Sequence, residues 1–211
     1  MRERTAVFFD VGGVLLTNGW DHESRRIAAE KFSLDFREFE AEHEKYADVL
    51  DTGNMAVSVY LDKVLFQKPR SFSKEEFYDF MKSRSIANEG AIDIAKQIAA
   101  QNRFLLSTIN NESTELNLYR IERFGLGSIF QLFLSSCYLG VRKPDAGIFV
   151  RALLLTNRRP DETVFIDDRA KNLEAPHQLG MGTIEFKNPL QLAEALRGFG
   201  IDVKCNSNGS T

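Results

Sequence analysis

The segment that most constrains the fold is residues 6–15, with the sequence AVFFDVGGVL. Its first four residues are apolar without a polar break, which is typical of a strand buried on both faces of a parallel sheet. Asp10 ends this run, and Gly12 and Gly13 follow at once. Open α/β sheets bind ligands at the carboxyl ends of their strands, and glycine lets the backbone turn close to a bound group. The segment therefore predicts either a ligand site at Asp10 or an ordinary turn after a strand.

The rest of the chain divides into a helical part and an alternating part. Between residues 17 and 86, apolar and charged residues recur at helical spacing, with helix-capping candidates at Asp21 and Ser73 and no strand candidate. Beyond this part, apolar strand-like segments alternate with helical ones. The predicted strands are 103–108, 132–135, 163–166 and 183–186, and the predicted helices are 89–101, 112–124, 144–155, 170–179 and 189–199.

This alternation predicts an α/β fold, in which a doubly wound parallel sheet is interrupted after its first strand by an all-helical insert. We expect an α/β core formed by residues 1–16 and 87–203, a helical cap over 17–86, and a disordered tail over 204–211. An insert that rises from the carboxyl end of the first strand lies over the ligand crevice, so it is in a position to act as a lid.

Composition narrows the class of protein. A formal net charge of −3 over 211 residues gives no reason to expect a nucleic acid or an anionic membrane as partner, and no apolar run approaches membrane-spanning length. Cys137 and Cys205 lack metal-ligand spacing, and no signal-like apolar segment opens the chain, so we expect free thiols and a cytoplasmic protein. The sequence leaves the oligomeric state open. The scattered histidines are interpreted as surface or supporting residues: His22, His43 and His177.

Polar side chains stand at or just after the ends of the predicted strands: Asp10, Ser107, Lys143, Asp167 and Asp168. Taken singly, each has an ordinary explanation as a helix cap or a solvated surface group. However, parallel strands place their carboxyl ends on one edge of the sheet, so these side chains can converge. Carboxylates that meet there repel one another unless a cation is present, and Mg²⁺ prefers such oxygen ligands. The pattern predicts a magnesium site with a lysine and a hydroxyl able to bind a phosphoryl group.

Four segments, in this order, resemble the motifs of the haloacid dehalogenase-like (HAD) hydrolase superfamily: FDVGGVL (9–15), LLST (105–108), GVRKPD (140–145) and FIDD (165–168). The resemblance is closest to phosphatase-type members with a helical cap, such as sugar-1-phosphate phosphatases and the N-terminal phosphatase domain of epoxide hydrolases. It implies a Rossmann-like core, bound Mg²⁺, and hydrolysis of a small phosphorylated metabolite through an aspartyl-phosphate.

The resemblance also implies roles for individual residues. Asp10 is the implied nucleophile, and Lys143 is the implied cation that offsets charge on Asp10 and on the phosphoryl group. The implied catalytic residues are Asp10, Ser107 and Lys143, and Asn172 is implied to orient the acidic loop. The implied metal ligands are Asp10, the carbonyl of Gly12, Asp168 and, as an outer or alternate ligand, Asp167. The expected substrate-binding residues are Ser107, Thr108, Lys143, Gly13 and Trp20, the last of which either walls the pocket or packs between cap and core.

Two positions depart from the family pattern. Phosphatases of this superfamily usually carry a second Asp two residues after the nucleophile, where this chain has Gly12. Glycine keeps the metal-binding carbonyl but has no proton to give, and loss of a general acid costs about 10²–10⁴-fold in rate. Certain sugar-1-phosphate phosphatases resemble this chain in having glycine there, and His22 is a remote candidate for the missing acid. The second departure is Thr108, where relatives often have Asn.

The sequence therefore supports a Mg²⁺-dependent phosphohydrolase that Gly12 limits to good leaving groups, such as an anomeric sugar phosphate. The alternative is a catalytically quiet protein that binds Mg²⁺ and a phosphorylated ligand or a protein partner. Dehalogenation of a haloacid is disfavoured by the Asp167–Asp168 pair, and a signalling receiver domain is disfavoured because its acidic pair lies on the first strand.

Overall fold

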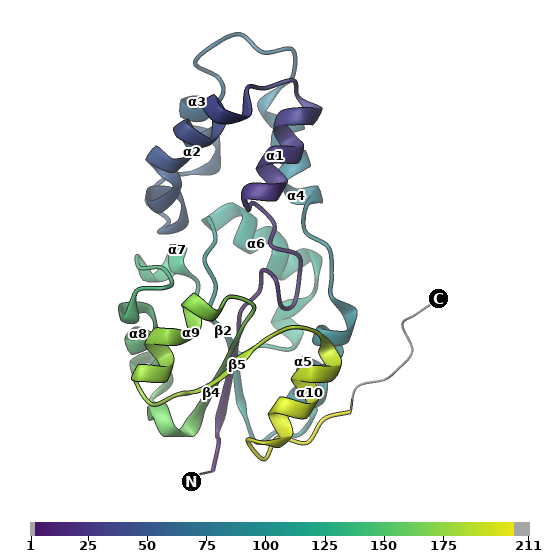
Figure 1. The fold of residues 1–211 in the computed structure, drawn as a ribbon, viewed down its shortest axis with the longest axis vertical. Helices are drawn as coiled ribbons and strands as arrows, with labels where there is room; N and C mark the ends of the chain where they lie inside the picture. The colour runs from purple at the N-terminus through teal and green to yellow at the C-terminus, as the bar shows by residue number, and fades with distance from the viewer. Residues whose placement is uncertain (1–2, 205–211) are drawn as a thin grey trace.

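The computed structural model describes residues 3–204, so Cys205 and nearly all of the predicted tail lie outside the described residues. Its centre is a five-stranded sheet in the order β3-β2-β1-β4-β5, and every pair of neighbouring strands is parallel. The predicted doubly wound parallel sheet is confirmed (Figure 1). The strands are β1 (Ala6–Phe9), β2 (Leu105–Thr108), β3 (Leu132–Phe133), β4 (Thr163–Asp167) and β5 (Gly182–Glu185).

The helices fall into those inserted after β1 and those that alternate with the later strands. The inserted helices are α1 (His22–Lys31), α2 (Phe36–Asp51), α3 (Val57–Val64) and α4 (Lys74–Ser83). The others are α5 (Glu89–Ala100), α6 (Thr114–Arg123), α7 (Ser136–Leu139), α8 (Ala146–Thr156), α9 (Ala170–Gln178) and α10 (Pro189–Arg197). Two 3₁₀ turns, Leu126–Ser128 and Pro160–Glu162, precede β3 and β4.

The unbroken apolar character of β1 follows from burial on both faces. Val7 and Phe9 pack in the apolar cluster that includes residues of α5 and α10, whereas Ala6 and Phe8 pack in the cluster that includes α8 and α9. All four side chains are fully buried. Since successive side chains of a strand point to opposite faces, a central strand covered by helices on both sides needs apolar residues at every position.

The helices α1–α4, here called the helical insert, have their own apolar core. Side chains of Asp21, Asp35 and Ser73 accept hydrogen bonds from backbone N–H groups in the first turns of α1, α2 and α4, as N-caps do. The apolar faces of these helices meet around the fully buried Tyr60 and Phe77. The insert stands beyond the carboxyl ends of the strands (Figure 1).

Two chain crossings join the insert to the sheet, and they lie side by side. Leu16 and Ala87 form an antiparallel bridge, and Thr17 accepts a hydrogen bond from the Ile86 N–H through its side-chain oxygen. Arg120 of α6 packs its guanidinium group against Gly19 and donates from Nε to Ser85 Oγ at 3.1 Å. The base of the insert is therefore fixed to the core at both crossings. None of the described helices is long and apolar enough to cross a membrane.

Candidate active site

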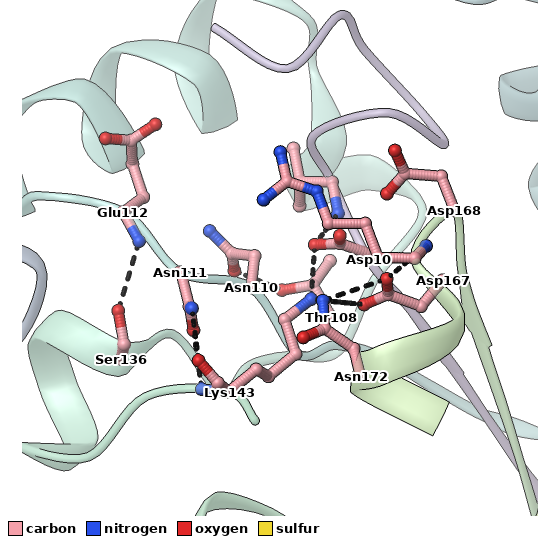
Figure 2. A network of polar contacts seen from close by, with 12 residues as sticks. Asp10, Thr108, Asn110, Asn111, Glu112, Ser136, Lys143, Asp167, Asp168 and Asn172 are labelled. Atoms are coloured by element: carbon pink, nitrogen blue, oxygen red, sulfur yellow. Dashed lines mark hydrogen bonds and ion pairs between the residues drawn. The ribbon is translucent and has the colours of Figure 1, made fainter. Parts of the chain in front are cut away.

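The carboxylates of Asp10, Asp167 and Asp168 come together at the carboxyl edge of the sheet. Asp10 directly follows β1, and Asp167 is the last residue of the neighbouring β4, where Phe9 pairs with Ile166. One oxygen from each of the three carboxylates lies within 4.8 Å of the others (Figure 2). The structure thus brings together side chains that are more than 150 positions apart in the sequence.

Lys143 joins the first two of these carboxylates. Its Nζ lies 2.8 Å from Asp10 Oδ1 and 2.6 Å from Asp167 Oδ2, and its side chain is almost completely buried. Asn111 holds the lysine backbone from both sides, because its Oδ1 accepts from Lys143 N at 2.8 Å and its Nδ2 donates to Lys143 O at 2.9 Å. Sequence reasoning missed Asn111, which is distinguished only by its place in the loop that follows β2.

Asp167 is fully engaged by neighbouring groups. Asn172 Nδ2 lies 3.0 and 3.1 Å from its two oxygens, and the Arg169 N–H donates to Oδ1 at 2.9 Å. With the Lys143 contact added, both oxygens of this buried carboxylate have partners. Asn172 thus contacts the acidic loop as expected, and the role of Asp167 as an outer or alternate metal ligand stays a prediction.

Asp168 differs because it retains unused acceptor capacity. Its Oδ2 accepts a long hydrogen bond from Asn18 Nδ2 at 3.4 Å, while its Oδ1 is buried and has no hydrogen-bond partner among the described residues. A buried carboxylate oxygen without a partner is costly. A hard divalent cation beside Asp10 and Asp168 would satisfy this oxygen, so the donor set fits Mg²⁺.

The electrostatics of the cluster point in the same direction. Burial raises the pKa of Asp10 to about 7; the charges of Asp167 and Asp168 add to this rise, and Lys143 opposes it. Burial and the charge of Asp167 also raise the pKa of Asp168. Burial acts to lower the pKa of Lys143, but the charges of Asp10 and Asp167 outweigh it, and that pKa is raised. The lysine therefore stays charged, and its charge does not offset the effect of burial on Asp10.

The two glycines after Asp10 have different surroundings. Gly13 has a φ of +81°, and a Cβ at this position would overlap the Asp168 carboxylate. A Cβ at Gly12 would meet only Asn18, at 3.5 Å or more. Gly13 is therefore required for the close approach of the β1 loop to Asp168, whereas Gly12 leaves room for a side chain.

The two hydroxyl residues at the end of β2 are also placed differently. Ser107 pairs with Phe8, and its buried hydroxyl donates to the Leu132 carbonyl oxygen at 3.0 Å. Thr108 pairs with Phe9, one position nearer the strand end, and its buried hydroxyl donates to Asn110 Oδ1 at 3.5 Å, one of the contacts in Figure 2. Neither hydroxyl has a hydrogen bond to Asp10, Asp167 or Asp168, and the substrate-binding roles of Ser107 and Thr108 stay predictions.

A cavity of about 650 Å³ lies between the sheet edge and the helical insert. Asp10, Gly12 and Lys143 line its core side. From the insert side it is lined by residues that include Trp20, His43, Arg25 and Asp51. Asp10 of the carboxylate cluster therefore faces a cavity with mostly polar walls, as a site for a polar small molecule requires.

Trp20 and the three histidines lie in different surroundings. Trp20 lines this cavity and packs against Phe77 within the insert, with only 9% of it exposed, and its substrate-binding role stays a prediction. His22 also lines the cavity, with an exposed ring 3.8 Å from the Glu40 carboxylate. His177 is on the surface as interpreted, whereas His43 is buried within the insert, where its Nδ1 lies 2.8 Å from the Tyr60 hydroxyl.

Comparisons with known proteins agree with this geometry. Curated proteins similar to the chain include the chloroplastic flavin mononucleotide hydrolase 1 of Arabidopsis thaliana, which is 26% identical over 155 residues, 74% of this chain and 60% of that protein. Bifunctional epoxide hydrolase 2 of Rattus norvegicus is 29% identical over 133 residues, 61% of this chain and 23% of that protein. The chain therefore spans less than two thirds of the length of either relative.

Among solved structures, a HAD family enzyme of Bacteroides thetaiotaomicron, in complex with magnesium and inorganic phosphate, superposes with a TM-score of 0.71. The match is 18% identical in sequence and covers 88% of this chain and 95% of that one, which shows a shared fold. A family model described as haloacid dehalogenase-like hydrolase matches residues 5–180. This match covers most of the chain, and we conclude that the protein belongs to the haloacid dehalogenase-like hydrolase family.

Proposed function

We propose that the protein is a Mg²⁺-dependent phosphohydrolase of a small phosphorylated metabolite, with Asp10 as nucleophile. The observation that carries the proposal is the position of Asp10, in contact with Lys143, beside two further carboxylates and facing a polar cavity. In this proposal residues 17–86 act as the cap over residues 1–16 and 87–203. The substrate is a small molecule rather than a nucleic acid or a membrane, and a cytoplasmic location is part of the same proposal.

The contacts of Asp10 distinguish its two oxygens. The Val11 N–H donates to Oδ1 at 2.7 Å, and Lys143 Nζ contacts the same oxygen at 2.8 Å. This leaves Oδ2 as the oxygen available for attack on phosphorus. The bond from Oδ2 to phosphorus forms as the ester P–O bond breaks, and the leaving oxygen departs with the electron pair. A water molecule then attacks the aspartyl-phosphate, which releases inorganic phosphate and regenerates the carboxylate.

The residues that would hold Mg²⁺ are Asp10, Asp168 and the Gly12 carbonyl, with Asp167 as an outer ligand. When bound, Mg²⁺ supplies positive charge against the phosphoryl oxygens. Lys143 holds Asp10 in place and contributes a second positive charge at the phosphoryl group. The Thr108 hydroxyl, and Ser107 if it can exchange its sheet partner, would hydrogen-bond the phosphoryl oxygens.

Gly12 determines which esters can react. No carboxylic acid stands at this position to protonate the leaving oxygen, so the proton comes from water or from the substrate itself. Esters with weakly basic leaving groups need this proton least. An anomeric sugar phosphate belongs to this class, and it is the substrate type we favour.

The test measures Mg²⁺-dependent phosphate release from p-nitrophenyl phosphate, glucose 1-phosphate, glucose 6-phosphate and flavin mononucleotide. Wild type should release phosphate fastest from the first two, and Asp10→Asn should reduce release to background. Gly12→Asp, for which the cavity has room, should raise the rate on glucose 6-phosphate more than on p-nitrophenyl phosphate. Release that is absent for every ester, or that persists in Asp10→Asn, would refute the proposal.

The absence of a side chain at Gly12 also favours a second candidate, a protein that binds Mg²⁺ and a phosphorylated ligand or a protein partner without turnover. Such a protein would be stabilised against heat by phosphate esters, because a ligand that binds only the native state raises its stability. Stabilisation without any phosphate release would favour this candidate over the enzyme.

A further inference from the structure

His43, on α2, occupies the boundary between the interior of the insert and the cavity. It lines the cavity with 9% of its surface exposed. Its Nδ1 lies 2.8 Å from the Tyr60 hydroxyl, and the two rings are perpendicular. Trp20 Nε1 donates to the same hydroxyl at 3.2 Å. Hydrogen bonds thus connect Trp20, Tyr60 and His43 in one chain, inside an otherwise apolar cluster.

The hydrogen-bonding capacities of the three groups fix where the protons lie. Indole N–H is a donor only, so the Tyr60 oxygen accepts from Trp20. Tyr60 is fully buried, and burial raises its pKa, so it keeps its proton and needs an acceptor. Among the described residues, the acceptor in contact with it is His43 Nδ1. The ring proton of a neutral His43 therefore sits on Nε2, and burial, with the nearby Arg25 charge, lowers the pKa of His43 to about 4, which keeps it neutral.

The Nε2 edge of the ring is the one that faces the cavity. Nδ1 points to Tyr60, which is completely buried, so the part of His43 that lines the cavity is the opposite edge. No described residue hydrogen-bonds to Nε2. A donor that is fixed in orientation and has no partner in the protein is suited to a ligand.

The charged residues around His43 indicate which kind of ligand group this end of the cavity can bind. Arg25 is paired with Glu40 and also donates to the Trp20 carbonyl oxygen at 2.8 Å. Arg142 is paired with Asp48 and Asp51, at 3.0 and 2.8 Å. Both arginines near His43 already have carboxylate partners, and Glu44, next to His43 on α2, also lines the cavity, so this end offers no free positive charge to a second anionic group; the other cations of the lining, Arg169 and Lys171, belong to the α9 side. The His43 end favours an uncharged, oxygen-bearing group.

We infer that His43 is a substrate-binding residue that donates a hydrogen bond from Nε2 to an uncharged oxygen, a hydroxyl or a carbonyl, in the organic part of the phosphorylated substrate. Tyr60 and Trp20 are positioning residues that hold the imidazole in this tautomer. The inference rests on the proposed function for the phosphoryl end of the substrate, and it narrows the substrate class to monophosphates whose other part is neutral and carries a hydroxyl or carbonyl oxygen.

The first test does not depend on turnover. Long-range ¹H–¹⁵N spectra of the imidazoles should show His43 as the neutral Nε2–H tautomer. Adding glucose 1-phosphate to Asp10→Asn protein should shift its Nε2 signal, and inorganic phosphate alone should shift it less. A His43 response supports the inference even if wild type hydrolyses no ester, a result that would refute only the proposed function. An Nδ1–H tautomer, or no response to the sugar phosphate, overturns the inference even if phosphate is released.

The second test distinguishes a substrate-binding role of His43 from a purely structural one. His43→Phe should raise the KM for glucose 1-phosphate by about 3- to 10-fold, the effect of losing one neutral hydrogen bond, and by less for phenyl phosphate. His43→Gln, which restores an N–H donor, should recover part of this loss. Tyr60→Phe should raise the same KM and weaken the tautomer preference. The control is His177→Gln, on the exposed face of α9. Equal KM changes for both esters would contradict the inference.

Discussion

At the scale of single residues, the site is a cluster of acidic groups with more negative than positive charge, which could hold a metal ion. Three carboxylates lie together, Lys143 contacts only two of them, Asp10 and Asp167, and one buried oxygen of Asp168 has no hydrogen-bond partner among the described residues. The pKa of Asp10 is raised to about 7 because burial and its acidic neighbours outweigh Lys143. In the proposed site, a proton and Mg²⁺ would therefore compete for Asp10.

This competition predicts how the affinity for Mg²⁺ depends on pH. Below about pH 7 a proton must leave Asp10 before the cation binds, so affinity should rise up to about tenfold per pH unit between pH 5.5 and 7 and then level off. Calorimetric titration with Mg²⁺ at pH 5.5, 6.5 and 8.0 measures this. Asp10→Asn should bind more weakly and show a shallower dependence, and affinity that is constant from pH 5.5 to 8.0 would contradict the prediction.

The adjacent glycines give a second prediction at this scale. Gly13→Ala should weaken Mg²⁺ binding and lower the thermal midpoint, because it combines a left-handed φ with an overlap on Asp168. We expect a loss of about 1–3 kcal/mol in stability. Gly12→Ala adds the same methyl group where there is space. Thermal unfolding of both variants, with and without Mg²⁺, compares them, and similar midpoints would show that the loop has freedom to move away.

At the scale of elements, core residues attach the insert by making hydrogen bonds to helix ends that the insert's own side chains do not cap. The residue before α3, Ala56, has no side chain to cap the helix, and Glu115 of α6 instead accepts from the Val57 N–H at 2.9 Å. At the end of α2, Ser136 Oγ donates to the Asp51 carbonyl oxygen, and Gly53 approaches the Cys137 backbone. The end of α2 and the start of α3 are thus held by α6 and α7.

The Glu115 contact can be tested by moving the cap from the core to the helix itself. Glu115→Ala should lower the free energy of unfolding by about 1 kcal/mol, the usual value of an N-cap. Adding Ala56→Asp should restore much of that stability, because aspartate caps α3 locally, but it should not restore the tie between insert and core. Urea unfolding measures the first effect, and proteolysis in the native state measures the second. Full recovery of both would mean that Glu115 only caps the helix.

Helices and strands could be predicted from the sequence where the residue pattern within the segment itself identifies them, and the site could be predicted only in part. The apolar strands, the insert after β1 and the Asp10, Lys143, Asp167–Asp168 set could be expected from pattern, motif and order. β3 has only two residues of the predicted strand 132–135, and the four-residue α7 (Ser136–Leu139), which begins directly after that segment, was not predicted, since neither has enough length to carry a periodicity. Asn111 and the burial of His43 depend on contacts between distant elements, which the spacing of residues does not encode.

At the scale of the whole molecule, the cavity exists only while the insert stays on the core, and Asp51 lies at that junction. Its side chain contacts Arg142, which directly precedes Lys143, and it lines the cavity. Burial raises the pKa of Asp51 to about 7; the charge of Glu112 adds to this rise, and Arg142 opposes it. A carboxyl group with a pKa above its unfolded value contributes stability at low pH and loses that contribution as the pH rises through about 7.

Asp51→Asn should therefore be about as stable as wild type near pH 4, and should become more stable than wild type by roughly 1 kcal/mol between pH 5 and 8, a figure reduced for partial exposure to solvent. Urea unfolding at pH 4, 6 and 8 measures the difference, with Asp48→Asn as the control, because Asp48 contacts the same arginine from an exposed position. If wild type instead gains stability over the variant as the pH rises, the Arg142 ion pair outweighs burial, and the junction is held by charge rather than weakened by it.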